Sequence, residues 1–196
     1  MRDFYYYEPR RGHGLADDPL KTVIDAKPNG WISSLSGAGV ADLTLYRFFD
    51  TFSHSPLVMG FFGDESKDSI RNIAETGEFS WNLAVHTRAA ANHLSAAPSS
   101  VVADELAKAA LTPIRSRHIS AHRIAESAVS FECHLMRLVR LQDIAGRASE
   151  TWLILSEVVA VHMDALLING STSDKAIVNG HVDEEGGVSR HGKSNT

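Results

Sequence analysis

Two long segments in the second half of the chain, residues 128–141 and 151–163, constrain the fold most strongly. Both have the composition of β-strands, and the second contains three valines together with isoleucine and tryptophan. Strands of open sheets are usually about five or six residues long, whereas a sheet that bends around a barrel uses longer ones. The two segments therefore predict a closed antiparallel barrel.

Shorter segments complete this pattern. Strands are expected at residues 22–25, 31–35, 57–62 and 79–85. The turn Pro28-Asn29-Gly30 predicts that the first two form a hairpin, because Asn-Gly readily adopts left-handed conformations. Helices are expected near residues 66–76, 87–95 and 103–110. Because no regular alternation of strands and helices appears, the expected class is mainly β, with helical insertions.

Length and composition describe one ordinary globular domain. A chain of 196 residues can bury roughly 70% of its unfolded surface. The formal net charge of -5 argues against nucleic acid as a partner. No window approaches the ~18 consecutive apolar residues of a membrane helix, and residues 1–11 lack the apolar region of a signal peptide. Since Cys133 is the sole cysteine, a reducing compartment is expected, namely the cytoplasm.

The chain divides into three parts. Residues 1–20 are polar, carry two prolines and are expected to form an N-terminal arm. Residues 21–182 are expected to form the folded domain. Apolar residues thin out beyond this point, so residues 183–196 are expected to be a polar, mobile tail.

The helix expected at residues 66–76 has an unusual start. Ser66 is a candidate N-cap and Gly77 a candidate stop. Lys67, Ser69 and the free backbone N–H groups of the first turn would then point at one spot, and such a spot suits a phosphate. An ordinary capped surface helix with a solvated lysine fits the same residues, so the pattern alone leaves both interpretations open.

Other reaction chemistries find little support. The chain has no Gly-x-Gly-x-x-Gly, Walker loop or Gly-x-Ser-x-Gly, which argues against a Rossmann enzyme or a serine hydrolase. His118 and His122 have the spacing of a zinc pair, but no third ligand is close in sequence, so no metal is expected. The basic segment 115–123 lacks aromatic residues and is expected to be a solvated loop. Cys133 and His162, both within strands, are expected to be a buried inert thiol and a structural histidine.

Three segments, taken in order and spacing, carry a resemblance. They are residues 28–34 (PNGWISS), residues 42–50 (DLTLYRFFD) and residues 67–83, which contain KDS, GEF and NL. Together they resemble the flavin reductase-like family of FMN-binding split barrels, and the likeness extends to about residue 170. The resemblance implies a six-stranded antiparallel split β-barrel over residues 21–182. It also implies a homodimer that binds FMN in a groove near the subunit interface.

The resemblance also assigns the site. Around the FMN phosphate it places Ser33, Ser34, Lys67, Asp68 and Ser69. Along the isoalloxazine edge it places a loop at residues 44–50, with Thr44, Leu45, Tyr46, Arg47, Phe49 and Asp50. This edge departs from the family pattern, because Leu45 replaces proline, Arg47 replaces serine, and Asp50, like Asp42, replaces asparagine. An ion pair of Arg47 with a carboxylate could lie beside the flavin or only at the groove rim, and both remain open.

The activity implied by the resemblance is NAD(P)H-dependent flavin reduction. Hydride would pass from NADH or NADPH to FMN, and the reduced flavin would serve a partner oxygenase. No side chain is required as an acid or base, so catalytic residues stay unassigned. A flavoredoxin-like electron carrier with a protein partner is one alternative. A flavin-free split-barrel dimer is the other, supported by the altered loop and by a C-terminal tail that ends before the family's usual tyrosine.

Overall fold

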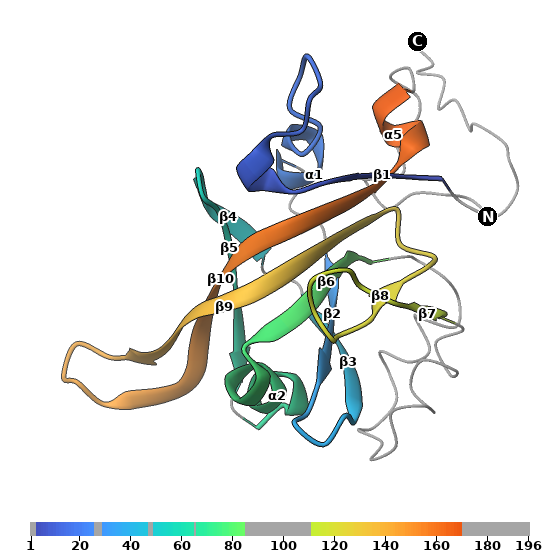
Figure 1. Cartoon of the computed structure of the whole chain (residues 1–196). Coiled ribbons are helices and arrows are strands. Elements are labelled where there is room, and N and C mark those ends of the chain that lie inside the picture. Colours follow the sequence, from blue (N-terminus) through green and yellow to red (C-terminus); the bar gives the residue numbers. More distant parts are fainter. Residues whose placement is uncertain (1–2, 26–28, 47–48, 65, 85–110, 170–196) are drawn as a thin grey trace, which may run out of the picture.

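The computed structural model describes residues 3–25, 29–46, 49–64, 66–84 and 111–169 (Figure 1). Most of this backbone is β-strand, which confirms the mainly β class. The strands are β1 (Phe4–Tyr7), β2 (Gly30–Leu35), β3 (Ala41–Tyr46), β4 (Phe49–His54), β5 (Leu57–Asp64), β6 (Glu78–Leu83), β7 (Pro113–Ile114), β8 (Arg123–Ile124), β9 (Val129–Gln142) and β10 (Ala148–Asp164). The helices are the 3-10 turn η1 (Pro9–Arg11), α1 (Lys21–Asp25), α2 (Asp68–Thr76) and α5 (Ala165–Asn169).

One antiparallel sheet organises the molecule. Its order is β3-β2-β6-β9-β10-β5-β4, with β1 added on β10, so the described residues form eight paired strands rather than the six expected. The two long strands expected from the sequence are β9 and β10, which extend together beyond the other strands in Figure 1. A separate pair, β7 and β8, lies beside this sheet.

The sheet curls until its two ends share a core. Tyr46 on β3 lies 4.7 Å from Phe61 on β5, measured between ring centroids. Phe49 on β4 stacks on Trp81 of β6 at 4.7 Å, and Phe131 of β9 stacks on Trp81 at 4.8 Å. The inner face is therefore enclosed by aromatic side chains from both ends of the strand order, as in a barrel.

The prediction of a hairpin around Asn29-Gly30 is wrong. Residues 21–25 form α1 rather than a strand, because Leu20, Val23 and Ile24 bury one helical face against the barrel. Strand β2 pairs instead with β3 and β6. Gly30 is required by packing within β2: a Cβ atom there would lie 1.8 Å from the indole nitrogen of Trp81.

The loop expected at residues 44–50 is mostly strand. Strand β3 continues to Tyr46 and β4 begins at Phe49, because both aromatic side chains are buried in the core. Arg47 lies outside the described residues, as do the helices expected at 87–95 and 103–110 and the tail at 183–196. Residues 3–20 were expected to form an arm, but they are part of the folded barrel. Strand β1 pairs with β10, and the side chains of Tyr7 and Leu20 belong to the core.

Candidate functional site

Helix α2 carries the proposed phosphate-binding end. It ends at Gly77, whose φ of 74° is left-handed as expected. It begins one residue later than expected, because Lys67 is the N-cap and no side chain caps the helix. The backbone N–H of Ser66 donates instead to Asp64 at 2.8 Å. The start of α2 therefore combines uncapped backbone with a lysine.

The charges at this helix start favour an anion. The Lys67 ammonium lies 5.6 Å from the ring centroid of Tyr46 and forms no ion pair within the described ranges. Asp68, the acid of the first turn, is paired with Arg71. Asp64, just before the helix, has its pKa lowered by hydrogen bonds from Ser66 and, to a smaller extent, by the charge of Lys67, so it balances part of this charge, while the helix dipole adds positive potential at the same spot.

Two of the serines expected to bind the phosphate, Ser69 and Ser34, already form hydrogen bonds with other side chains. The hydroxyls of Ser69 and Tyr46 lie 2.7 Å apart, and both side chains are buried. Burial raises the pKa of Tyr46, so this hydroxyl stays protonated. Ser34 accepts a hydrogen bond of 3.2 Å from Asn72 of α2. Ser69 and Ser34 therefore hold α2 against the barrel.

The serines of β2 point to opposite sides of the sheet, since successive side chains of a strand alternate. Ser34 lies on the side of α2 and of Tyr46. Ser33 lies on the outer face, opposite Leu43 of β3. That outer face carries a second apolar cluster of Trp31, Leu43, Leu111 and Ile124, against which Leu45 and Ala84 pack. The residues expected around one phosphate thus divide between two faces of β2.

Among the residues expected at the isoalloxazine edge, two belong to the core. Tyr46 and Phe49 are only 6% and 4% exposed. Thr44, Leu45 and Asp50 are half-buried. Thr44 donates to Asp42 at 3.1 Å, and the Asp50 carboxylate accepts from the N–H of Thr51 at 2.9 Å. The accessible part of this edge is therefore smaller and more polar than the resemblance implies.

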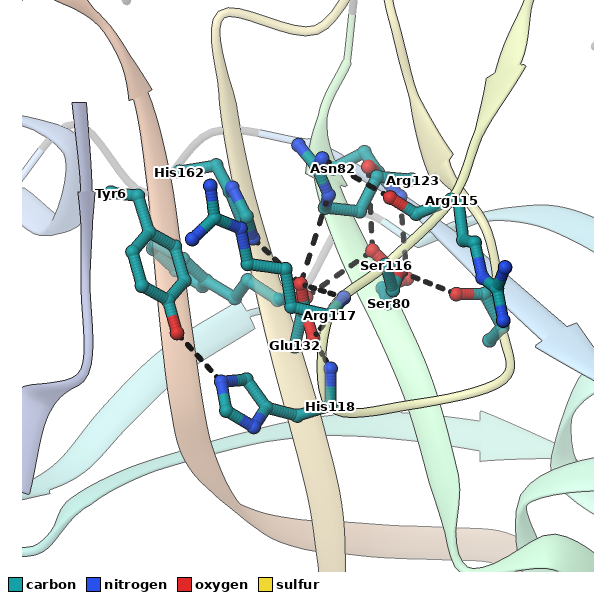
Figure 2. Close-up of polar contacts among 12 residues, drawn as sticks. Tyr6, Ser80, Asn82, Arg115, Ser116, Arg117, His118, Arg123, Glu132 and His162 are labelled. Atoms are coloured by element: carbon teal, nitrogen blue, oxygen red, sulfur yellow. Dashed lines mark hydrogen bonds and ion pairs between the residues drawn. The ribbon is translucent and has the colours of Figure 1, made fainter. Parts of the chain in front are cut away.

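A buried carboxylate that sequence reasoning missed lies on the outer face of β6 and β9 (Figure 2). Glu132 of β9 has no exposed surface. It accepts hydrogen bonds from the N–H groups of Arg117 and His118, the latter at 2.7 Å, and its Oε1 lies 2.6 Å from Nε2 of His162. The Arg123 guanidinium lies 3.8 Å from the same oxygen. The sequence did contain one signal of this buried carboxylate, because Glu132 stands between Phe131 and Cys133 within a segment that was expected to be a strand.

The environment keeps Glu132 ionised. Burial opposes the charge, but the hydrogen bonds from His162 and from the two backbone N–H groups outweigh it. They lower the pKa of Glu132 to about 2. Burial lowers the pKa of His162 below its ordinary value, although the hydrogen bond with Glu132 opposes this shift. The structural role expected for His162 is confirmed.

The basic segment 115–123 is not the solvated loop expected from its composition. The backbone N–H of Ser120 donates to Glu78 at 2.6 Å, and the hydroxyl of Ser116 donates to the carbonyl of Ala121 at 2.5 Å. Ser116, Ile119, Ala121 and Arg123 are buried. His118, one of the spaced histidines, lies 2.6 Å from the hydroxyl of Tyr6. The segment is a fixed loop that covers the polar outer face of β6 and β9.

The lone cysteine is buried, as expected. Its Sγ lies 3.4 Å from the sulfur of Met59, and burial raises the pKa of the thiol. Among the described residues, no group of three or more histidine, cysteine or acidic side chains could hold a metal ion. Within the same part of the chain, no helix has the length and apolar character needed to cross a membrane.

Comparison with known proteins decides the family. The sequence model of the flavin reductase like domain matches residues 26–171, which is more than half of the chain. The chain belongs to the flavin reductase-like family. Its split-barrel fold, with mainly antiparallel strands, agrees with this membership. The family membership supports a flavin cofactor and oxidoreductase chemistry.

Individual relatives of this flavin reductase-like chain agree. An uncharacterised protein of Aquifex aeolicus is 29% identical over 140 residues, which cover 69% of this chain and 71% of that protein. Nitrilotriacetate monooxygenase component B from Bacillus cereus has a TM-score of 0.61 and 28% identity, and the match covers 70% and 69% of the two chains. A split barrel domain protein of Shewanella frigidimarina has a TM-score of 0.62 over 87% and 81%; at 19% identity it shows the fold alone.

The chemistry of the donor set fits the phosphate end of a flavin nucleotide. Lys67 supplies a cation that no carboxylate of the described chain pairs, and the helix start beside it has no side-chain cap. Backbone N–H groups with an adjacent cation are the usual combination for phosphate recognition in proteins. This fit rests on Lys67 and on the backbone of α2, because the hydroxyls of Ser69 and Ser34 already have partners.

Proposed function

We propose that this flavin reductase-like protein binds FMN and reduces it with NADH or NADPH. The observation that carries the proposal is the uncapped start of α2, where Lys67 adds a positive charge that forms no ion pair with an acidic residue of the described chain. When bound, the flavin supplies the redox chemistry by accepting a hydride from the nicotinamide. The protein's own part is to position the two ligands and to set the charge around them.

The chain offers residues for each end of the cofactor. Lys67 and the N–H groups of the first turn of α2 would hold the phosphate, with Asp68 held aside by Arg71. Ser33, on the opposite face of β2, is not part of this end. Ser34, Ser69 and Tyr46 would fix the wall behind the phosphate through their hydrogen bonds. The ring would lie along the end of β3 and the start of β4, where Leu45 points to the outer face, Thr44 points to the opposite face and Asp50 is half-buried, with Phe49 in the core and Arg47 in the segment between the two strands.

A partner oxygenase is part of the proposal. One solved relative is a monooxygenase component B, and this chain is 28% identical to it. Oxidation of NADH or NADPH by the purified protein in the presence of FMN separates the reductase from an electron carrier that only retains flavin. Flavin that stays tightly bound while neither nicotinamide is oxidised would favour the flavoredoxin-like alternative.

The substitution Lys67→Ala is expected to weaken FMN binding about tenfold, because a charge-assisted contact to the phosphate is lost. Riboflavin, which lacks the phosphate, should bind the variant and the wild type equally. Lys67→Arg retains the charge and should keep most of the affinity for FMN. Fluorescence titration with both flavins measures the three proteins, and an equal loss of riboflavin and FMN binding would contradict the assignment of Lys67.

A homodimer is the second expectation, and an exposed apolar row supports it. Phe62, Leu153 and Val139 lie in register across β5, β10 and β9, and Phe62 and Val139 are 43% and 42% exposed. Phe52, 54% exposed, lies over Gly60 on the same face. We propose that a second copy covers this row.

Sedimentation should therefore give about twice the 21.4 kDa of one chain. The double substitution Phe62→Glu/Val139→Glu should produce monomers, since charges at the row would be desolvated on association. Val40→Glu, at an apolar residue between β2 and β3 that is 54% exposed, is the control and should remain dimeric. A monomeric wild type at micromolar concentration would exclude this interface.

A further inference from the structure

The loop at residues 115–123 concentrates positive charge on an acidic protein. It contains three arginines and two histidines and no acidic residue, whereas the whole chain has a formal net charge of -5. Arg123 is buried and lies beside Glu132. Arg115 and Arg117 have exposed side chains and form no ion pair within the ranges the structure describes. The loop thus presents two uncompensated guanidinium groups.

The backbone beneath these two arginines is held in place from several sides. Glu132 accepts from the N–H groups of Arg117 and His118, and Glu78 accepts from that of Ser120. The Arg117 guanidinium also lies 4.0 Å above the ring of Tyr6, a contact that restricts its side chain. Because the loop is ordered before any ligand arrives, binding to it has a smaller entropy cost than binding to a flexible segment.

Acidic side chains lie at both ends of the loop. At its start, the Glu126 carboxylate accepts from the N–H of Thr112 at 2.8 Å. Glu8 of the N-terminal segment lies 3.8 Å from the His118 ring and accepts a hydrogen bond of 3.2 Å from Tyr6. The carboxylates of Glu132 and Glu78 face the backbone of the loop from beneath. The surface that Arg115 and Arg117 present is therefore cationic, with its acidic partners underneath or at its ends.

The loop borders the proposed flavin site. Strands β7 and β8 flank it, and Ile124 of β8 packs with Trp31 and Leu43 on the outer face of β2 and β3. Leu45, one of the residues proposed for the flavin ring, packs against this same cluster. A ligand that extends from this face toward the loop would bring its phosphates to the arginines.

We propose that Arg115 and Arg117 bind the pyrophosphate of a dinucleotide whose other end lies at the flavin site. The inference rests on the proposed function and adds a second anion subsite to it. A pyrophosphate carries its negative charges on neighbouring phosphoryl groups, and guanidinium forks match such oxygens. NADH and NADPH carry this group, whereas the pyrophosphate of FAD includes the phosphate that FMN already has. FMN has only the phosphate assigned to Lys67.

The test compares two double variants of equal charge. Arg115→Gln/Arg117→Gln removes the proposed contacts but leaves the backbone bonds to Glu132 intact. Arg140→Gln/Arg147→Gln removes two exposed arginines from the β9–β10 hairpin, away from the loop (Figure 1). Equilibrium dissociation constants are measured for NAD+, NADP+, FAD, FMN and inorganic pyrophosphate at two salt concentrations.

We expect the dissociation constant of NAD+ or NADP+ to rise about tenfold in the loop variant and not in the hairpin variant. FMN affinity should not change, and the salt dependence of dinucleotide binding should become weaker. Arg115→Lys/Arg117→Lys keeps the charge and should fall between the wild type and the glutamine variant. The dinucleotide whose affinity changes identifies the ligand of the loop.

Other outcomes separate the two proposals. Unchanged dinucleotide and pyrophosphate affinities in the loop variant, with FMN bound normally, overturn the loop assignment alone. An equal loss for FMN also overturns it, because FMN has no pyrophosphate. If the wild type binds no FMN, the proposed function fails, and pyrophosphate and NADP+ still test the loop directly. A wild type that binds none of the pyrophosphate ligands overturns the inference.

Discussion

Replacing Glu132 by alanine is expected to lower the free energy of unfolding by about 3 to 5 kcal/mol, because a buried ionised network loses its central acceptor. The N–H groups of Arg117 and His118 would lose their acceptor, as would His162. Arg123, of which Nε and Nη1 already lack a hydrogen bond, would lose its nearby counter-charge as well. Urea unfolding followed by tryptophan fluorescence measures this loss.

Two variants make the Glu132 measurement specific. Glu132→Gln keeps an acceptor oxygen and should be less destabilised than the alanine variant. Glu157→Ala removes an acid from the neighbouring strand β10, where the partner Arg10 is exposed, and should change the midpoint little. Equal losses of unfolding free energy for Glu132→Ala and Glu157→Ala would contradict this prediction, because the buried network would then stabilise the fold no more than an exposed ion pair does.

The same network gives stability a defined acid dependence. The folded-state pKa of Glu132, about 2, lies below the ordinary value of 4.5. The unfolded chain therefore binds the proton first as the pH falls. The contribution of this carboxylate should be complete above about pH 5 and should disappear between pH 4.5 and 2. Over this interval, the difference in unfolding free energy between wild type and Glu132→Gln should shrink.

Gly30→Ala is expected to destabilise the barrel by about 3 kcal/mol, although it adds only one methyl group. The new Cβ would meet three atoms of the Trp81 ring at 1.8, 2.3 and 2.6 Å. Trp81 cannot move aside easily, because it has no exposed surface and is stacked between Phe49 and Phe131. Thermal and urea unfolding of the variant measure the loss.

A second substitution tests the cause of this effect. Trp81→Phe removes ring atoms that the new methyl group would meet, and alone it should be destabilising because it leaves a cavity. Combined with Gly30→Ala, it should cost less than the sum of the two single changes, since the methyl group fills part of that space. Strict additivity would show that the backbone of residue 30, and not the indole, determines the need for glycine.

Local patterns in the sequence predicted the regular elements well. Both long strands, the strand at 57–62 and the helix before Gly77 appear where periodicity placed them. The prediction of a strand at 22–25 was wrong. Val23 and Ile24 are β-branched and favour a strand, but their spacing from Leu20 also suits one face of a helical turn. Tertiary burial, which a local pattern does not contain, decided between the two.

The site was predicted in outline only. Lys67 and the start of α2 follow from local sequence, so their position was accessible to reasoning. The orientation of Ser33 and Ser34 depends on which strands flank β2, and the pairing of Glu132 with His162 joins β9 to β10 across 30 residues. Such contacts depend on sheet register, and one sequence without an alignment does not reveal the register.

The strand order ends on β3 and β4, and the aromatic side chains inside hold these two ends together. Strands at the ends of a sheet open more easily than its central members, so their amide hydrogens exchange with solvent sooner than those of β9 and β10. The described residues proposed for the flavin ring lie in these two end strands: Thr44, Leu45 and Tyr46 in β3, and Phe49 and Asp50 in β4. Protection of these amides against deuterium would therefore report occupancy of the site without any measurement of turnover.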